Sequence, residues 1–400
     1  MVDELNGKKL LIIVENLPVP PDRRVWQEAK ALKEAGCEVS VICPTGRGYY
    51  KKHEILDGIH IFRHPLPIEA DGALGYLLEY SSALFWEFIL AWRILFTRGF
   101  DAIHACNPPD TIFIIGLFFK LLGKKFVFDH HDLNPELYVV KFGTKGFLHR
   151  MLLLMERLTF WTATVSIATN ESYKRVAIER GGCDEEKVFV VRSAPDMSNI
   201  MPSSINKSLY NGRKHIVGDV GVMASQDGID GLLRAAKILV KDYGYTDVQF
   251  VLIGGGTELE SLKNYAIELG ISEFVTFTGW LKGDDLLIAL NTIDVGAAPD
   301  AADDYNDKCT MNKIMEYMAL GKPIVQYDVT EGRYSAQEAS LYAEKNDESS
   351  FADKLLELLN NKKLREEMGL MGKKRMEEVL GWKYEKPKLI AAYKKLFDLL

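Results

Sequence analysis

The chain has 400 residues, more than one hydrophobic core usually supports, so we expect two domains. An apolar content of 47% and a charged content of 26% are typical of a globular protein, and the net charge of −7 excludes a general nucleic-acid binder. The polar N-terminus lacks a signal-peptide pattern, and no apolar run has the length of a membrane-spanning helix. We therefore expect a cytoplasmic protein.

Strand-like apolar runs alternate with helical patterns, which predicts an α/β fold with parallel strands. The first series has a helix over 23–35 and strands over 9–14, 38–43, 59–63, 102–106, 125–129, 163–168 and 188–191. The second has strands over 216–222, 249–253, 275–278, 295–298 and 324–327. Residues 192–214 are rich in Pro, Ser and Asn and read as a linker. We expect domains over 1–195 and 196–383, with a helix over about 384–400 that packs back on the first domain.

The five cysteines are scattered and form no Cys-x-x-Cys pair. Such an odd set is typical of a reducing compartment and argues against a structural zinc site. We expect no metal site and no cofactor.

Glu316 stands out within residues 311–323, MNKIMEYMALGKP, which otherwise have the pattern of a buried helix. Gly321 ends this helix and Pro323 prevents its continuation. An unpaired buried carboxylate is costly, so Glu316 needs a partner. The vicinal hydroxyls of a ribose are one such partner, and an ion pair with Lys313 is the alternative.

The triple glycine Gly254, Gly255 and Gly256 lies between an expected strand and an expected helix. A glycine turn before a helix lets backbone N–H groups approach a phosphate. The alternative is a plain tight turn, because the run is not a complete Gly-x-Gly-x-x-Gly motif.

Polar side chains also follow several strands of the first series. Ligands of open parallel sheets bind at the carboxyl ends of the strands, so these residues are candidate site groups. Turn formation and helix capping are the alternatives. The residues are Glu15, Asn107, Asp110, His130, His131 and Asp132.

Taken in order, these segments resemble the retaining glycosyltransferases of family 4, in a branch that assembles bacterial polysaccharides. The resemblance covers nearly the whole chain and is carried by ENLPVPPDRRVWQEAKALKEAGCEVSVICP, IHACNPPDTIF, FVFDHHDLNPELY, GVMASQDGIDGLLRAAKIL, VLIGGGTELESLK and KIMEYMALGKPIV. It implies the GT-B fold, in which two Rossmann-like domains face each other across a cleft. The N-terminal domain would bind the acceptor and the C-terminal domain the nucleotide sugar.

The resemblance also implies residue roles. Glu316 matches the second Glu of the family's E-x7-E motif and would accept hydrogen bonds from the ribose. His130, His131 and Asp132 are candidates for contact with the transferred sugar and for the catalytic step. Retaining transfer in this family needs no dedicated enzymic nucleophile, so we assign no catalytic base. Glu15, Asn107 and Asp110 are the candidate acceptor-side residues.

The chain departs from the family at the diphosphate. Val222 and Asp227 stand where the family has an Arg and a Lys, and Lys308 falls on the first Glu of the E-x7-E motif. The glycine pair of the family's first loop falls near Val19 and Pro20. Other cations must then neutralise the diphosphate.

Lys313 is the first candidate because it lies one turn before Glu316 on the same helix. Arg333 follows a strand and a short loop, so its guanidinium could clamp a phosphate with two hydrogen bonds. Arg23 and Arg24 open the first helix, where a solvated turn is the alternative. Lys308 and Asn312 complete the expected donor-binding set.

Two segments are apolar and aromatic: residues 75–98 and residues 146–161. Each could lie in a membrane interface or form a core helix, and the basic residues of the second make it the better membrane candidate. A lipid-linked acceptor would make such contact useful at the inner face of the membrane.

The resemblance thus implies a metal-independent, retaining glycosyltransferase that moves a sugar from a uridine-linked donor to a saccharide acceptor. We expect this acceptor to be lipid-linked. Its partners would be the nucleotide sugar, the acceptor and the membrane surface, and no nucleic acid. Two alternatives stay open: a sugar-nucleotide epimerase of the same fold, and a non-catalytic binding subunit, which the replacements at Val222 and Asp227 favour.

Overall fold

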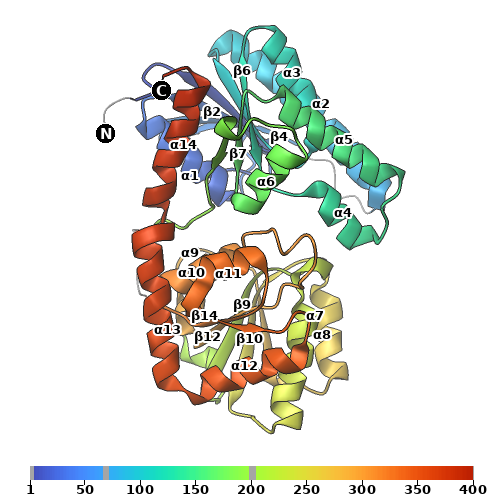
Figure 1. Ribbon diagram of the computed structural model, residues 1–400, viewed down its shortest axis with the longest axis vertical. Coiled ribbons are helices and arrows are strands. Elements are labelled where there is room, and N and C mark those ends of the chain that lie inside the picture. Colours follow the sequence, from blue (N-terminus) through green and yellow to red (C-terminus); the bar gives the residue numbers. More distant parts are fainter. Residues whose placement is uncertain (1–3, 66–71, 198–203, 400) are drawn as a thin grey trace. The chain divides into compact units, whose positions relative to one another are not determined.

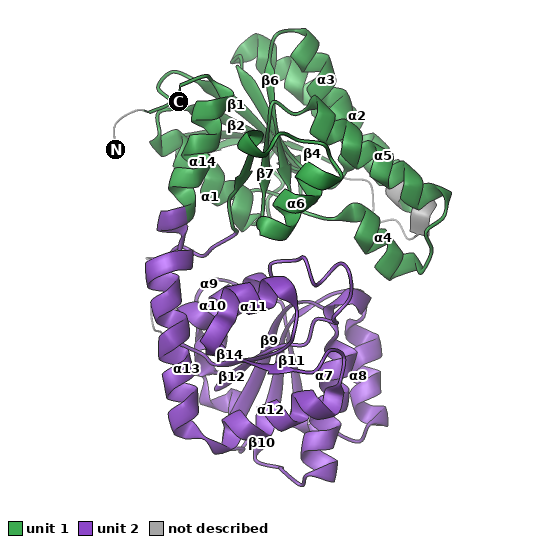
Figure 2. Ribbon diagram, viewed as in Figure 1, with its two compact units in different colours: residues 1–192, 385–400 green, residues 193–384 purple. Residues whose placement is uncertain are grey.

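The computed structural model describes residues 4–65, 72–197 and 204–399. The chain forms two compact units, one of residues 1–192 with 385–400 and one of residues 193–384 (Figure 2). The expected boundaries at 195 and 384 lie within a few residues of these limits. Part of the expected linker, residues 198–203, lies outside the described residues.

The first unit is built on an eight-stranded sheet in the order β3-β4-β2-β1-β5-β6-β7-β8. All neighbouring strands are parallel except β3 and β4. The strands are β1 (Lys9–Ile13), β2 (Glu38–Pro44), β3 (His53–Leu56), β4 (Ile59–His64), β5 (Ala102–Cys106), β6 (Lys125–His130), β7 (Val165–Ala168) and β8 (Val188–Val190). The central strands are apolar runs buried on both faces, as parallel strands under helices must be.

The helices of the first unit connect these strands (Figure 1). They are α1 (Arg23–Glu34), α2 (Gly72–Thr97), α3 (Phe113–Leu121), α4 (Asn134–Phe142), α5 (Phe147–Thr162), α6 (Glu171–Glu179) and the final helix α14 (Trp382–Leu396). The C-terminal part of α14 belongs to this unit, where Tyr393 is buried and its hydroxyl lies 2.7 Å from His104 Nδ1 of β5.

The second unit holds a six-stranded parallel sheet in the order β11-β10-β9-β12-β13-β14. Its strands are β9 (His215–Val222), β10 (Val248–Gly255), β11 (Val275–Gly279), β12 (Val295–Ala298), β13 (Ile324–Tyr327) and β14 (Ser340–Ala343). Its helices are α7 (Ile229–Lys237), α8 (Leu259–Glu268), α9 (Gly283–Thr292), α10 (Asn312–Ala319), α11 (Thr330–Ala336), α12 (Glu348–Asn360) and α13 (Lys362–Arg375). The sequence patterns missed the short strands β3 and β14.

Helix α10 ends as the sequence predicts, with Gly321 in the left-handed region at φ 68°. The helix lies close to the sheet because Gly296 of β12 has no side chain: a Cβ there would sit 2.4 Å from the ring of Tyr317. The Tyr317 hydroxyl also accepts a hydrogen bond from Val220 N of β9 at 3.1 Å. These contacts fix α10 against the ends of β9 and β12.

Among the helices in the described parts of the chain, none is long and apolar enough to cross a membrane.

Candidate functional site

In the second unit, the carboxyl ends of β9 and β10 carry two loops that are pressed together. A Cβ at Gly254, which has φ 136°, would lie 1.9 Å from the carbonyl oxygen of Gly221, and a Cβ at Gly256 would lie 2.4 Å from that of Met223. Glycine is therefore required here by backbone packing alone, which supports the tight-turn reading. The phosphate role of this turn stays a prediction, and Glu258 beside it would repel an anion.

Lys313, near the start of α10, lies in a buried ion-pair cluster. Its Nζ is 3.0 Å from Asp219 Oδ1 of β9 and 3.2 Å from Asp300 Oδ2, just after β12. The three side chains are 10%, 0% and 5% exposed. Burial lowers the pKa of Lys313, but these carboxylates, with Asp227 nearby, raise it more, so the ammonium stays charged. Lys313 ties α10 to the ends of β9 and β12.

This geometry corrects the expectation for Lys313. A cation paired with two buried carboxylates brings no net positive charge to a diphosphate. Burial and the neighbouring carboxylates Asp300 and Asp219 also raise the pKa of Asp227 to about 6, with Lys313 opposing the shift. The cluster around Lys313 is therefore acidic, the opposite of what the family's Arg and Lys would provide.

The other expected cations also have protein partners. Lys308 Nζ donates to the Asp304 carbonyl oxygen at 2.8 Å. Arg333 makes two 2.7 Å hydrogen bonds to Asp328, so its fork is occupied by a carboxylate where we expected a phosphate. Arg23, the first residue of α1 in the other unit, is exposed. To bind a phosphate, any of these side chains would have to exchange its present partners for the phosphate or bind the phosphate in addition to them.

Glu316 lies one turn after Lys313 on α10 and is partly exposed, whereas its neighbours Met315 and Tyr317 are buried. Asn312, the first residue of the helix, is exposed. Because Lys313 and Tyr317 hold α10 in place, the backbone that carries Glu316 is fixed at this edge of the sheet. Contact between Glu316 and a ribose stays a prediction.

In the first unit, the strands β1, β5 and β6 are neighbours, so the predicted polar residues meet at their carboxyl ends. Asn107 joins the loops: its Oδ1 accepts from the backbone N–H of His131 at 2.7 Å and of Asp132 at 3.2 Å, and its Nδ2 donates to the Asp132 carbonyl and to Asp110. Asp110 is buried and also accepts from Asn134 Nδ2 at 2.8 Å. Asn107 and Asp110 therefore stabilise the loops and do not present free groups to an acceptor.

His130 also differs from the expectation, because it is fully buried. Side chains alternate along a strand, so His130 points to the face of β6 opposite that of Asp129. Its ring packs against Phe160 and Tyr173, with centroids 5.1 and 5.0 Å away, and its Nε2 lies 3.6 Å from Glu156 Oε1. A direct contact between His130 and a sugar is inconsistent with this packing. His131 and Asp132 are partly exposed and remain candidates.

The sequence reasoning missed a buried polar network behind this edge. Arg24 Nε and Nη2 donate to the two oxygens of Asp129 at 3.0 and 2.7 Å, and Glu28 lies 3.1 Å from Nη2. His104 Nε2 lies 3.3 Å from Asp129 Oδ2, and His131 Nε2 lies 2.5 Å from the same oxygen. A solvated role for Arg24 is therefore wrong. The available signal was Asp129 itself, a charge in an apolar strand that must have a partner.

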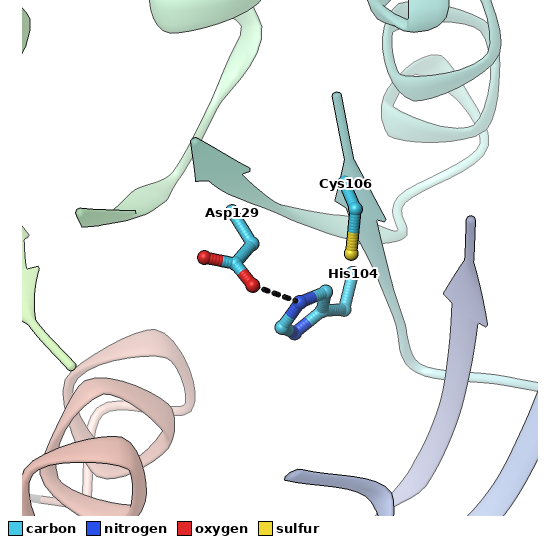
Figure 3. Close-up of side chains that lie close together, drawn as sticks. All are labelled: His104, Cys106 and Asp129. Atoms are coloured by element: carbon cyan, nitrogen blue, oxygen red, sulfur yellow. Dashed lines mark hydrogen bonds and ion pairs between the residues drawn. The ribbon is translucent and has the colours of Figure 1, made fainter. Parts of the chain in front are cut away.

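Among the described residues, His104, Cys106 and Asp129 could together hold a metal ion, and Figure 3 shows the three side chains converging. Arg24, however, already occupies both oxygens of Asp129. Burial, with the nearby carboxylates, raises the pKa of Cys106 well above its usual value, which keeps it a thiol. A divalent cation would have to displace the guanidinium, so these residues do not fit a metal.

Glu15, at the carboxyl end of β1, is 2% exposed, and burial together with Glu79 raises its pKa to about 8. Burial and Glu15 likewise raise the pKa of Glu87 of α2 to about 8, and neither oxygen of Glu87 has a hydrogen-bond partner. Both carboxyls are thus neutral near pH 7. Glu15 stays a candidate acceptor-side residue, now as a buried acid.

Solved structures share this fold over nearly the whole chain. Sucrose-phosphate synthase from Thermosynechococcus elongatus superposes with a TM-score of 0.78 at 16% identity, covering 98% of this chain and 100% of that one. HepE from Anabaena, solved in complex with UDP-glucose, gives a TM-score of 0.72 at 14% identity over 96% and 99%. The α/β fold with two Rossmann-like units is thus that of the GT-B glycosyltransferases, as predicted.

Sequence comparison narrows this class. Residues 22–198 match the family described as "Glycosyltransferase Family 4" and residues 214–361 match "Glycosyl transferases group 1". The chain belongs to glycosyltransferase family 4. A curated relative, the capsular polysaccharide biosynthesis glycosyltransferase CapM of Staphylococcus aureus, is 26% identical over 245 residues, which are 58% of this chain and 62% of CapM. In three curated relatives the matched part covers 62%, 47% and 54% of their length.

Proposed function

We propose that this protein is a retaining glycosyltransferase that transfers a sugar from a nucleotide-diphosphate sugar to a saccharide acceptor. The observation that carries the proposal is the placement of Glu316. It is a partly exposed carboxylate on a helix held against the carboxyl ends of β9 and β12, in a chain of family 4. Glu316 would accept hydrogen bonds from the ribose, and the amides of Gly254–Gly256 would face the diphosphate.

A uridine-linked donor is the choice that the fold neighbours support, since HepE is described in complexes with UDP and UDP-glucose. We propose that the reaction is metal-independent, with backbone amides and side-chain cations carrying the diphosphate charge. In the first unit, His131, Asp132 and the neutral acid Glu15 would contact the transferred sugar or the acceptor hydroxyl. Asn107 and Asp110 would hold their loop.

The name of CapM supports a role in capsular or other cell-surface polysaccharide synthesis. We propose a lipid-linked saccharide as the acceptor, which would place the enzyme at the cytoplasmic face of the membrane. This proposal concerns the acceptor and is separate from the assignment of the donor.

One observation favours a second candidate, a non-catalytic binding subunit. The residues at the diphosphate positions, Val222 and Asp227, are apolar and acidic, and Lys313 is neutralised by Asp219 and Asp300. Such a subunit would bind a nucleotide weakly or not at all and would have no turnover.

Two steps test the proposal. Thermal unfolding with UDP, GDP, ADP and CMP identifies the nucleotide, because a ligand that binds only the folded state raises the unfolding temperature. The sugar form of that nucleotide is then incubated with lipid-linked saccharides, and products are analysed. A glycosylated acceptor is the expected result. Conversion of the donor sugar without an acceptor would identify an epimerase, and no nucleotide binding and no turnover would favour the binding subunit.

A further inference from the structure

Three neighbouring helices of the first unit expose large apolar side chains. Helix α2 contributes Leu78, Phe85, Ile89 and Phe96, helix α3 contributes Ile114, Phe118 and Leu121, and helix α5 contributes Phe147, Met151, Leu154 and Trp161. We name this set the apolar face. Monomeric soluble proteins rarely expose contiguous apolar areas of more than a few hundred Å², and larger areas mark interaction sites.

Helix α3 contacts both of the other helices, α2 and α5. Phe118 of α3 contacts two rings of α2, with its centroid 5.0 Å from that of Phe88 and 5.7 Å from that of Trp92. Trp92 in turn stacks on the exposed Phe96 at 5.2 Å. Helix α3 packs on α5, and Lys120 of α3 donates to the Thr162 carbonyl oxygen at the end of α5 (Figure 1).

On α5 the exposed apolar residues form a stripe that is separate from the buried face. Phe147, Met151, Leu154 and Trp161 recur at helical spacing, whereas the side of the helix that packs on the unit carries Thr159 and Phe160. Phe147 is 75% exposed, Leu154 51% and Trp161 68%. The unit therefore does not use this stripe for its own core.

Within the three chain segments that carry the apolar face, the exposed charged side chains are of one sign. In residues 78–98, 113–125 and 141–162, every exposed charged side chain is basic, while the acidic ones are buried or partly buried. The exposed ones are Arg93, Lys120, Lys141, Lys145, Arg150 and Arg157. Arg150 and Arg157 flank the α5 stripe, each one helical turn from Leu154.

We propose that the apolar face of α2, α3 and α5, with its basic side chains, is the surface by which this protein binds an anionic lipid membrane. Aromatic and aliphatic side chains would enter the interface between headgroups and acyl chains, and Lys and Arg would stay at the headgroups. A second copy of the chain fits less well, because a self-complementary contact would bring the basic side chains of both copies together. The inference rests on the surface alone and does not require the proposed enzymatic activity.

The test is co-sedimentation of the full chain with phosphatidylcholine vesicles that contain or lack phosphatidylglycerol. We expect binding only with the anionic lipid, and weaker binding as salt increases. The variant R150Q/R157Q should lose about 25-fold in affinity, taking about fivefold for each basic residue near the surface. The variant F147S/L154S/W161S should lose more than about tenfold in affinity for the vesicles, because burial of apolar side chains supplies the rest of the binding free energy.

Matched controls lie in the other unit. The variant I267S/L370S changes side chains that are 64% and 69% exposed, and K362Q/K363Q removes two exposed positive charges. Both should bind vesicles like the wild type, and all variants should unfold at the wild-type temperature, since the replaced side chains are exposed.

Absence of wild-type binding to anionic vesicles would overturn the inference, and so would unchanged binding by both α5 variants. Sedimentation velocity without lipid provides an independent check. A dimer that F147S/L154S/W161S abolishes would assign the apolar face to a second copy and would also overturn the inference. Loss of vesicle binding with retained sugar transfer to a soluble acceptor would support the membrane surface and the proposed function separately.

Discussion

Replacement of Lys313 with Met tests whether this residue acts inside the protein or on a ligand. The variant keeps most of the apolar stem but leaves Asp219 and Asp300 without their partner in a site that is 10% exposed or less. Removing one member of a buried ion pair typically costs about 3–5 kcal/mol, because the remaining charge stays buried. For a unit of this size each kcal/mol lowers the unfolding temperature by about 2–4 °C, so we expect a decrease of about 6–20 °C.

The loss should also depend on pH. Without the ammonium, the pKa of Asp219, already raised by burial, rises further. When the pKa of a carboxyl is higher in the folded protein than in the unfolded chain, the folded protein becomes less stable as the pH increases through that pKa. The difference between K313M and the wild type should therefore shrink as the pH falls from 7 toward 4, and D219N should partly restore the stability of K313M.

The measurements are thermal unfolding at pH 7 and urea unfolding at several pH values, with K263M as the control. Lys263 also makes a 2.7 Å ion pair, with Glu260, but the two side chains are 42% and 79% exposed. Such a surface pair is worth less than about 1 kcal/mol, so K263M should unfold close to the wild type. If K313M keeps wild-type stability and loses affinity for UDP but not for uridine, Lys313 is a phosphate cation and our assignment is wrong.

Three further predictions follow from the buried contacts. G256A should lower the free energy of unfolding in urea by about 2 kcal/mol, because its Cβ meets a backbone carbonyl. In the control G146A the Cβ has open space, so the free energy of unfolding should change by less than about 1 kcal/mol. Equal effects of the two substitutions would contradict the packing argument. The stability of E87Q relative to the wild type should rise by up to about 1.4 kcal/mol per pH unit between pH 5 and 8. The reason is that the pKa of Glu87 is raised in the folded protein, so the wild type becomes less stable as the pH increases over this range. Parallel curves of stability against pH for the two proteins would refute this prediction. Zn²⁺ or a chelator should leave the unfolding temperature unchanged, because Arg24 occupies the His104 cluster; a rise with Zn²⁺ would show a metal site.

The sequence predicted the elements that depend on local patterns. The apolar runs of parallel strands, the helix that ends at Gly321 and the meeting of strand ends at Asn107 all follow from periodicity, glycine and the geometry of parallel sheets. The GT-B fold followed from the order of the motifs. The strand β3 was missed because it is short and half exposed.

The charged side chains were harder to assign, because their partners lie far away in the sequence. Lys313 pairs with Asp219, 94 residues before it, and Arg24 with Asp129, 105 residues after it. Nothing in the local spacing reports such pairs. His130 and His131 also could not be separated without knowing which face of β6 meets the helices, since adjacent strand residues point in opposite directions.

The central claim is that the second unit binds a nucleoside diphosphate through Glu316. Calorimetric titration of UDP into the wild type, E316Q and the exposed control E338Q tests it directly. Hydrogen bonds to a charged group contribute about 1.5–3 kcal/mol, so E316Q should bind UDP about 10- to 150-fold more weakly, with its unfolding temperature unchanged and E338Q equal to the wild type. Equal affinity of E316Q and the wild type for UDP, or no binding of any nucleoside diphosphate, would contradict the account.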